Sequence, residues 1–213
     1  MAVTGLILIG FIVAHLLGNF LVFLGPDWMN SYAHHLRELG PLLWLVRIIL
    51  LVSVGLHIWA AVQLTIENRK ARPQNYHLKK SIQTTYAART MALSGIIVLA
   101  FIIYHLLHFT FRITNPEFSN LHDALGRPDV YSMVVLSFKN VYISSAYIFS
   151  MFLLCSHLSH GFASMFQSLG VNKEESIPTF KWAAKIFALI IFFGYSSIPL
   201  SILLGLVRTG VKV

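Results

Sequence analysis

Long apolar runs alternate with short polar segments along the whole chain. Five of these runs are long enough to cross a bilayer, because a spanning helix needs about 20 apolar residues. A span must be helical, since no water is present to satisfy its backbone N–H and C=O groups. Gly25-Pro26 and Gly40-Pro41 are typical of the gaps between runs. The pattern predicts an all-α integral membrane protein, one domain over 1–213, with spans at about 2–24, 41–66, 90–112, 140–169 and 182–207.

Composition supports this class and excludes several functions. The chain is 56% hydrophobic and 11% charged, whereas a soluble domain carries about 25% charged residues. No room remains for a soluble catalytic domain. A single cysteine, Cys155, excludes an internal disulfide and a cysteine-held iron–sulfur cluster, and we expect it to be a small buried residue. The first run lacks a basic n-region and a cleavage site, so we expect no cleavable signal peptide.

The net charge of +8 is concentrated beside one predicted loop rather than spread as a nucleic-acid-binding surface. Basic residues mark cytoplasmic loops of membrane proteins. We therefore expect an inner-membrane protein whose N-terminus is cytoplasmic and whose C-terminus lies outside. The same loop could dock a partner or meet anionic lipid. Its basic residues are Arg69, Lys70, Arg72, Lys79, Lys80 and Arg89.

An internal repeat brings candidate chemistry into the spans. Met1–Leu17 recurs as Met91–Leu107 with nine of seventeen positions identical, and both copies keep a histidine, His15 and His105. An ionisable side chain inside an apolar span is expensive and marks function by default. A repeat that preserves such a residue indicates a shared ligand.

Each of the first four predicted helices holds a histidine in its apolar run, and the fifth holds none. Counting about 1.5 Å per residue from the outer helix ends puts His15 and His105 at one depth and His57 and His157 on the order of 10 Å deeper. Two stacked imidazole pairs suit two b-type haems, each with one axial histidine from each side. We therefore expect helices 1–4 to form a haem-binding four-helix bundle with helix 5 peripheral.

Alternatives remain at this point. His108 and His160 each lie three residues after a candidate ligand and share nearly the same helix face. The repeat aligns His108 with Gly18, which favours His105, whereas helix 4 offers no such guide. Zinc is disfavoured because each pair lacks further ligands, while a proton relay stays open. The remaining histidines fall in predicted loops, where we expect them to be solvated: His34, His35, His77 and His122.

Three motifs resemble the membrane anchor of succinate dehydrogenases and fumarate reductases, in its single-chain, five-helix, di-haem form. Thr4-Gly5 precedes His15-Leu-Leu-Gly-Asn, and Ser94-Gly95 precedes His105-Leu-Leu-His-Phe. The third motif is His157 with Gly161, followed by Gly170 thirteen residues after the histidine. That spacing is similar to the ligand-bearing helix of the family and favours His157 over His160.

The resemblance implies two haem b groups, an inner one on His57 and His157 and an outer one on His15 and His105. It also implies a flavoprotein and an iron–sulfur subunit on the cytoplasmic side, with a possible higher oligomer. Electrons would pass from the iron–sulfur subunit through both haems to a quinone, menaquinone by analogy. Succinate chemistry would occur in the flavoprotein, so this chain is the non-catalytic electron-transfer subunit of the enzyme.

The resemblance also implies a quinone pocket near the outer haem, and depth in the membrane suggests residues that contact the haems. His34, Arg37 and Glu38 are quinone candidates, and Asp27 lies in the same predicted loop. Other readings are the di-haem cytochrome of a formate dehydrogenase or hydrogenase, and a histidine-relay proton transporter. Candidates for contacting the haem or its propionates are Thr4, Arg47, Arg89, Ser94, His108, Arg112 and His160.

Overall fold

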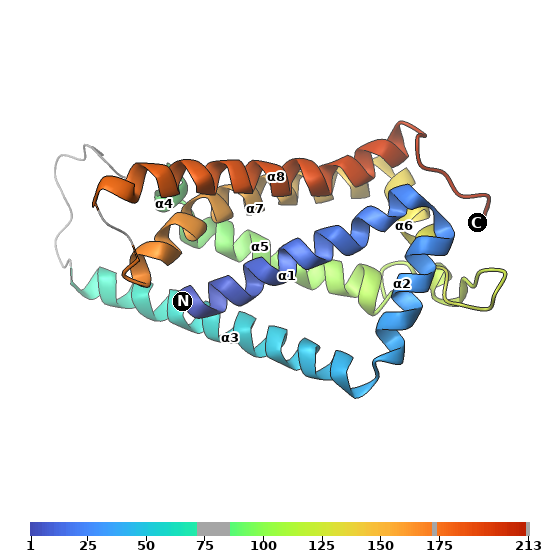
Figure 1. The fold of residues 1–213 in the computed structure, drawn as a ribbon, viewed down its shortest axis with the longest axis horizontal. Helices are drawn as coiled ribbons and strands as arrows, with labels where there is room; N and C mark the ends of the chain where they lie inside the picture. The colour runs from blue at the N-terminus through green and yellow to red at the C-terminus, as the bar shows by residue number, and fades with distance from the viewer. Residues whose placement is uncertain (72–85, 172–173, 212–213) are drawn as a thin grey trace.

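The computed structural model describes residues 1–71, 86–171 and 174–211. It contains five helices long and apolar enough to span a membrane, which confirms the predicted class (Figure 1). The first and third spans each continue into a short irregular turn. The spans are α1 (Ala2–Phe20) with a 3-10 turn (Leu21–Leu24), α3 (Pro41–Lys70), α5 (Met91–His105) with a π-helical turn (Leu106–Thr110), α7 (Val141–Ser168) and α8 (Ile177–Leu203).

Two segments predicted as loops, 25–40 and 113–139, contain helices, and this corrects the sequence analysis. Helix α2 (Pro26–Glu38) begins with proline in its first turn, and α6 (Val130–Lys139) is capped by the Asp129 carboxylate, which accepts from the Ser132 N–H at 2.9 Å. Hydropathy missed α2 because it is amphipathic and too polar to cross a bilayer. The shorter helices are α4 (Tyr86–Arg89) and the 3-10 turns Pro116–Asn120 and Glu174–Ser176.

Span ends also differ from the predicted ones. Helix α3 continues to Lys70 rather than residue 66, so its last turn is basic and extends past the apolar run. Helix α8 begins at Ile177, five residues before the predicted start, with Pro178 accommodated in its first turn. At the start of a helix the missing N–H of proline costs nothing, so Pro178 does not end the helix.

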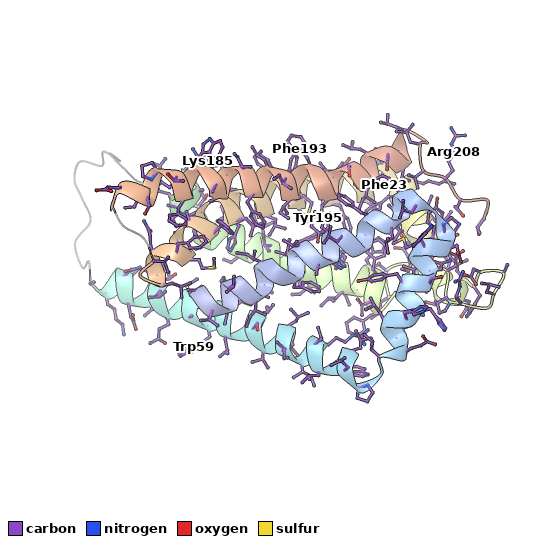
Figure 2. The ribbon with its side chains drawn as sticks, in the orientation of Figure 1. Phe23, Trp59, Lys185, Phe193, Tyr195 and Arg208 are labelled. Atoms are coloured by element: carbon purple, nitrogen blue, oxygen red, sulfur yellow. The ribbon has the colours of Figure 1, made fainter. Side chains whose placement is uncertain are left out.

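The spans pack as a twisted bundle in which α7 and α8 form the most extensive pair. Helix α1 packs against α3, α7 and α8, and α1 is the main neighbour of α3. Figure 2 shows Tyr195 of α8 directed toward α1, where its hydroxyl donates to the Ile12 carbonyl at 2.7 Å, and Trp59 directed away from α3. Helix α8 is well covered on its α7 side, whereas α3 has the most exposed surface.

Small residues set the distance between helices, as is typical where lipid gives no hydrophobic drive for association. Ala184 and Ala188 of α8 are fully buried, and Ala188 packs in one cluster with Leu16 of α1 and Leu158 of α7. At Gly194 an added Cβ would lie 2.8 Å from Cδ2 of Leu16, so the close approach of α8 to α1 depends on glycine there.

Arg127 fastens α2 to the 113–129 segment at the same end of the bundle. Its guanidinium pairs with Asp27 and Asp123, both at 2.7 Å, and donates to the Ser31 hydroxyl. Hydrogen bonds to the Asp27 and Asp123 carboxylates raise the pKa of Arg127. Burial would raise the pKa of Asp123, but bonds from Arg127 and the Leu125 N–H outweigh it and lower that pKa. The cluster is therefore fully charged at neutral pH.

Asn30 of α2 is the buried centre of this contact and is only 1% exposed. Its amide nitrogen donates to Asp129 at 3.0 Å and to Asp123 at 3.4 Å, and its amide oxygen accepts from the Tyr131 N–H at 3.0 Å. One side chain thus satisfies groups on the loop and on α6. We call the end of the bundle that carries α2 and 113–129 the α2 end.

Replacing Asn30 with alanine should destabilise the α2 end by about 1–3 kcal/mol, because a buried carboxylate and a buried N–H lose their partner. We expect a lower Tm for the detergent-solubilised protein and faster proteolysis of α2. His35→Ala, on the exposed face of the same helix, is the control. Equal stability of the two variants would contradict the role assigned to Asn30.

Candidate functional site

His15 of α1 and His105 of α5 face each other inside the apolar part of the bundle. Their ring centroids lie 5.8 Å apart with an interplanar angle of 84°. Aromatic side chains flank both rings: Phe11 stacks on His15 at 5.3 Å, and Phe101 lies 5.9 Å from His105. The structure thus brings together the two histidines of the repeat.

His57 of α3 and His157 of α7 form a second facing pair, with ring centroids 6.5 Å apart and an interplanar angle of 56°. His160, the alternative in the same helix, is 3.2 Å from the Ser164 hydroxyl through Nε2, one turn along its own helix. In this geometry His157, and not His160, is the partner of His57.

Both separations fit two imidazoles bound to opposite sides of one metal ion. Metal–imidazole bonds of about 2 Å place the two ring centres roughly 6 Å apart. In the part of the chain that the structure describes, no group of three or more metal-binding side chains occurs. Tetrahedral zinc needs more ligands than a pair supplies. Haem iron needs only the two axial ones, so the residues present fit haem.

In the His57–His157 pair, a hydroxyl group contacts Nδ1 of each ring. The Thr4 hydroxyl oxygen is 3.2 Å from Nδ1 of His57, and the Ser94 hydroxyl oxygen is 3.2 Å from Nδ1 of His157. These contacts leave Nε2 of each ring for the facing partner. Thr4 and Ser94 were expected near a haem by depth, and the structure puts them against the imidazoles.

The two pairs lie three helical turns apart. Thr4 marks the level of His57 in α1 and precedes His15 by eleven residues; Ser94 precedes His105 by the same eleven. Eleven residues place both groups on one helix face, roughly 16 Å apart along the axis. The count from the helix ends gave on the order of 10 Å, because it assumed that all helices end at one depth, whereas α1 and α3 diverge toward the α2 end (Figure 1).

His108 belongs to neither pair. It lies in the π-helical turn after His105, is 1% exposed, and its Nδ1 is 2.9 Å from the Tyr147 hydroxyl. The same hydroxyl is 3.4 Å from Nδ1 of His105, while Nε2 of His108 has no partner in the described residues. Tyr147 therefore bridges His105 and His108.

Three arginines gather at the α2 end. Burial lowers the pKa of Arg37, and the positive charges of Arg112 and Arg47 lower it further, so the three guanidiniums interact electrostatically. Arg47 lies 5.0 Å from the ring centre of Trp44, and Arg112 donates to the Ser119 carbonyl at 3.1 Å. No carboxylate pairs with any of the three in the described residues, so this surface would attract an anion.

The other predicted residues are dispersed. His34 pairs with Glu38 at 3.4 Å on the exposed side of α2, and Asp27 is engaged by Arg127. Arg89 lies at the opposite end of the bundle, over the Tyr86 ring at 5.9 Å. His35, which lies in α2 rather than in a loop, and His122 contact backbone carbonyls at 2.8 and 3.0 Å, and Cys155 is half-buried. Outside the described residues lie Arg72, His77, Lys79 and Lys80.

Comparison with protein families identifies the bundle. Residues 68–195 match the model of the succinate dehydrogenase/fumarate reductase transmembrane subunit. The chain belongs to this family. The match includes α5 and α7, with His105 and His157, while His15 and His57 lie before it. Comparisons with curated proteins and with solved structures returned no match. As a member of the family, the protein is a multi-pass membrane subunit of succinate:quinone oxidoreductase.

Sequence reasoning missed Tyr147 and the contacts of Thr4 and Ser94 with imidazoles. A usable signal existed, since the repeat keeps a hydroxyl residue followed by glycine in both copies. Nothing in the sequence marks Tyr147, which reaches α5 only because α7 packs beside it.

Tyr147→Phe should lower the unfolding free energy by about 1–3 kcal/mol, because it leaves Nδ1 of the fully buried His108 without a partner. We expect a lower Tm in detergent. Tyr142→Phe serves as the control, since this tyrosine of the same helix is exposed. A Tyr147→Phe variant as stable as the control would show that the bridge adds nothing.

Proposed function

We propose that this protein is the di-haem cytochrome b anchor of its complex, passing electrons between an iron–sulfur subunit and a membrane quinone, menaquinone by family analogy. It performs no succinate chemistry itself. The observation that carries the proposal is the two facing imidazole pairs, His15–His105 and His57–His157, inside apolar helices. Family membership supports the respiratory role over a proton transporter and over the anchor of a different complex.

The chain's own part is to hold and orient the haems and to shield them from water. Bound haem supplies an iron that gains and loses one electron. The histidines project from four rigid helices, so their positions change little when the iron gains or loses an electron. The surrounding apolar side chains exclude water, which favours electron transfer over side reactions. Three turns of α1 and α5 separate the levels of the two pairs, which would set two successive electron sites across the membrane.

Hydrogen bonds give the ligand ring of α5 a defined tautomer. If Nε2 of His105 binds iron, its Nδ1 carries the proton and donates to the Tyr147 oxygen. The Tyr147 hydroxyl can then donate to Nδ1 of His108, whose own proton lies on Nε2. His108 on this view orients Tyr147 and is not itself an axial ligand.

The soluble partners would dock at the end opposite α2. Arg69, Lys70 and Arg89 lie at that end among the described residues, and basic ends of spans face the cytoplasm. We therefore propose that the flavoprotein and iron–sulfur subunits bind there and that the α2 end faces outward in the inner membrane. The His57–His157 pair would then receive electrons first.

The quinone would bind at the α2 end. The unpaired charges of Arg37, Arg47 and Arg112 would stabilise haem propionates or a reduced quinone oxygen. Glu38 and His34 form an exposed pair on α2 that could exchange protons with such a quinone.

Glu38→Gln should slow quinone turnover several-fold while both haem spectra stay unchanged, because only proton delivery is lost. The measurement is dye-reduction activity beside quinone-reduction activity in membranes. Asp27→Asn, at an acidic residue of the same helix that pairs with Arg127, is the control. Normal quinone kinetics in Glu38→Gln would remove Glu38 from the site.

Ligand substitutions test the proposal as a whole. His57→Ala and His157→Ala should each remove one haem, and His15→Ala and His105→Ala the other, with the remaining haem retained. Reduced-minus-oxidised spectra and redox titration of the purified complex identify which is lost. His108→Ala and His160→Ala are the matched controls and should keep two haems. A haem lost in His160→Ala but kept in His157→Ala would reassign α7, and no b-type spectrum in the unaltered complex would overturn the function.

A further inference from the structure

We propose that Thr4 and Ser94 are positioning residues for the haem held by His57 and His157, each fixing one axial imidazole through its Nδ1. This inference rests on the proposed function. It assigns a role that depth in the membrane did not indicate, since both residues were expected to contact propionates.

The direction of each hydrogen bond follows from the hydroxyl groups. The Ser94 hydroxyl donates to the Met91 carbonyl at 3.0 Å, and the Thr4 hydroxyl donates to the Met1 carbonyl at 2.9 Å. A hydroxyl has one proton to give. The oxygen of each can therefore only accept from the facing imidazole, so Nδ1–H donates and the Nε2 lone pair stays free for iron.

Both residues occupy the fourth position of the repeat and precede a glycine that faces the same ring. An added Cβ at Gly5 would lie 3.7 Å from Cε1 of His57, and one at Gly95 would lie 3.5 Å from Cε1 of His157. The imidazole thus lies along the helix backbone with its Nδ1 at the hydroxyl. The same arrangement occurs twice, on α1 against α3 and on α5 against α7.

Each copy of the repeat then serves both haems. Its histidine binds one iron, and its hydroxyl–glycine pair holds a ligand of the other, eleven residues earlier on the same face. A histidine ligand that donates a hydrogen bond from the ring nitrogen that does not bind iron is more basic and has a fixed ring orientation. Such a ligand stabilises the ferric state, so it lowers the midpoint potential of its haem.

The test uses the purified complex with Thr4→Val and Ser94→Ala. For each variant we expect a higher midpoint potential and an altered low-spin electron paramagnetic resonance signal for the haem of the His57–His157 pair. The affinity of the complex for this haem, measured as haem loss on dilution, should fall by about 10–100-fold. The haem of the His15–His105 pair should keep its potential and signal.

Two further variants separate positioning from general structure. Thr4→Ser restores the hydroxyl and should return the potential to that of the unaltered complex. Ser150→Ala loses only an intrahelical bond to the Ala146 carbonyl in α7 and should change neither haem. Unchanged potential and resonance signal in both Thr4→Val and Ser94→Ala, in a complex that holds two haems, would overturn this inference alone. A complex without b-type haem would overturn it together with the proposed function.

Discussion

The histidine rings among the apolar helices need a bonding partner for each of their two nitrogens, and this constraint organises the bundle. His57 and His157 direct Nδ1 to hydroxyls of the neighbouring helix, and His105 directs Nδ1 to Tyr147. In each case the other nitrogen is left for the facing ring. A buried polar atom without a partner costs about 1–3 kcal/mol, and in the proposed function an axial bond to haem iron gives the second nitrogen of each ring its partner.

The repeat lets one helix supply groups to both sites. Eleven residues in a helix return to the same face after about three turns, so a hydroxyl at the start of each copy and a histidine at its end both face inward. Helices α1 and α5 can therefore contact two sites at two depths, while α3 and α7 contribute one histidine each. Helix α8 lacks histidine and instead packs against α7 and α1 with small residues.

Much of this could be predicted from the sequence, because membrane solvation imposes strong patterns. The apolar runs determined the five spans, and the histidines in the first four spans indicated the pairs. Helices α2 and α6 could not be predicted, since hydropathy separates spans from everything else and α2 is amphipathic. The roles of Thr4, Ser94 and Tyr147 depend on which helices are neighbours, and side-chain spacing within one helix carries no such information.

The most direct test is the amount of haem in the purified complex. Pyridine haemochrome analysis against quantified protein should give two b-type haems for each copy of this chain, resolved as two midpoint potentials in a redox titration. One haem per chain, or none, would contradict the central claim that the two imidazole pairs are axial ligand sets.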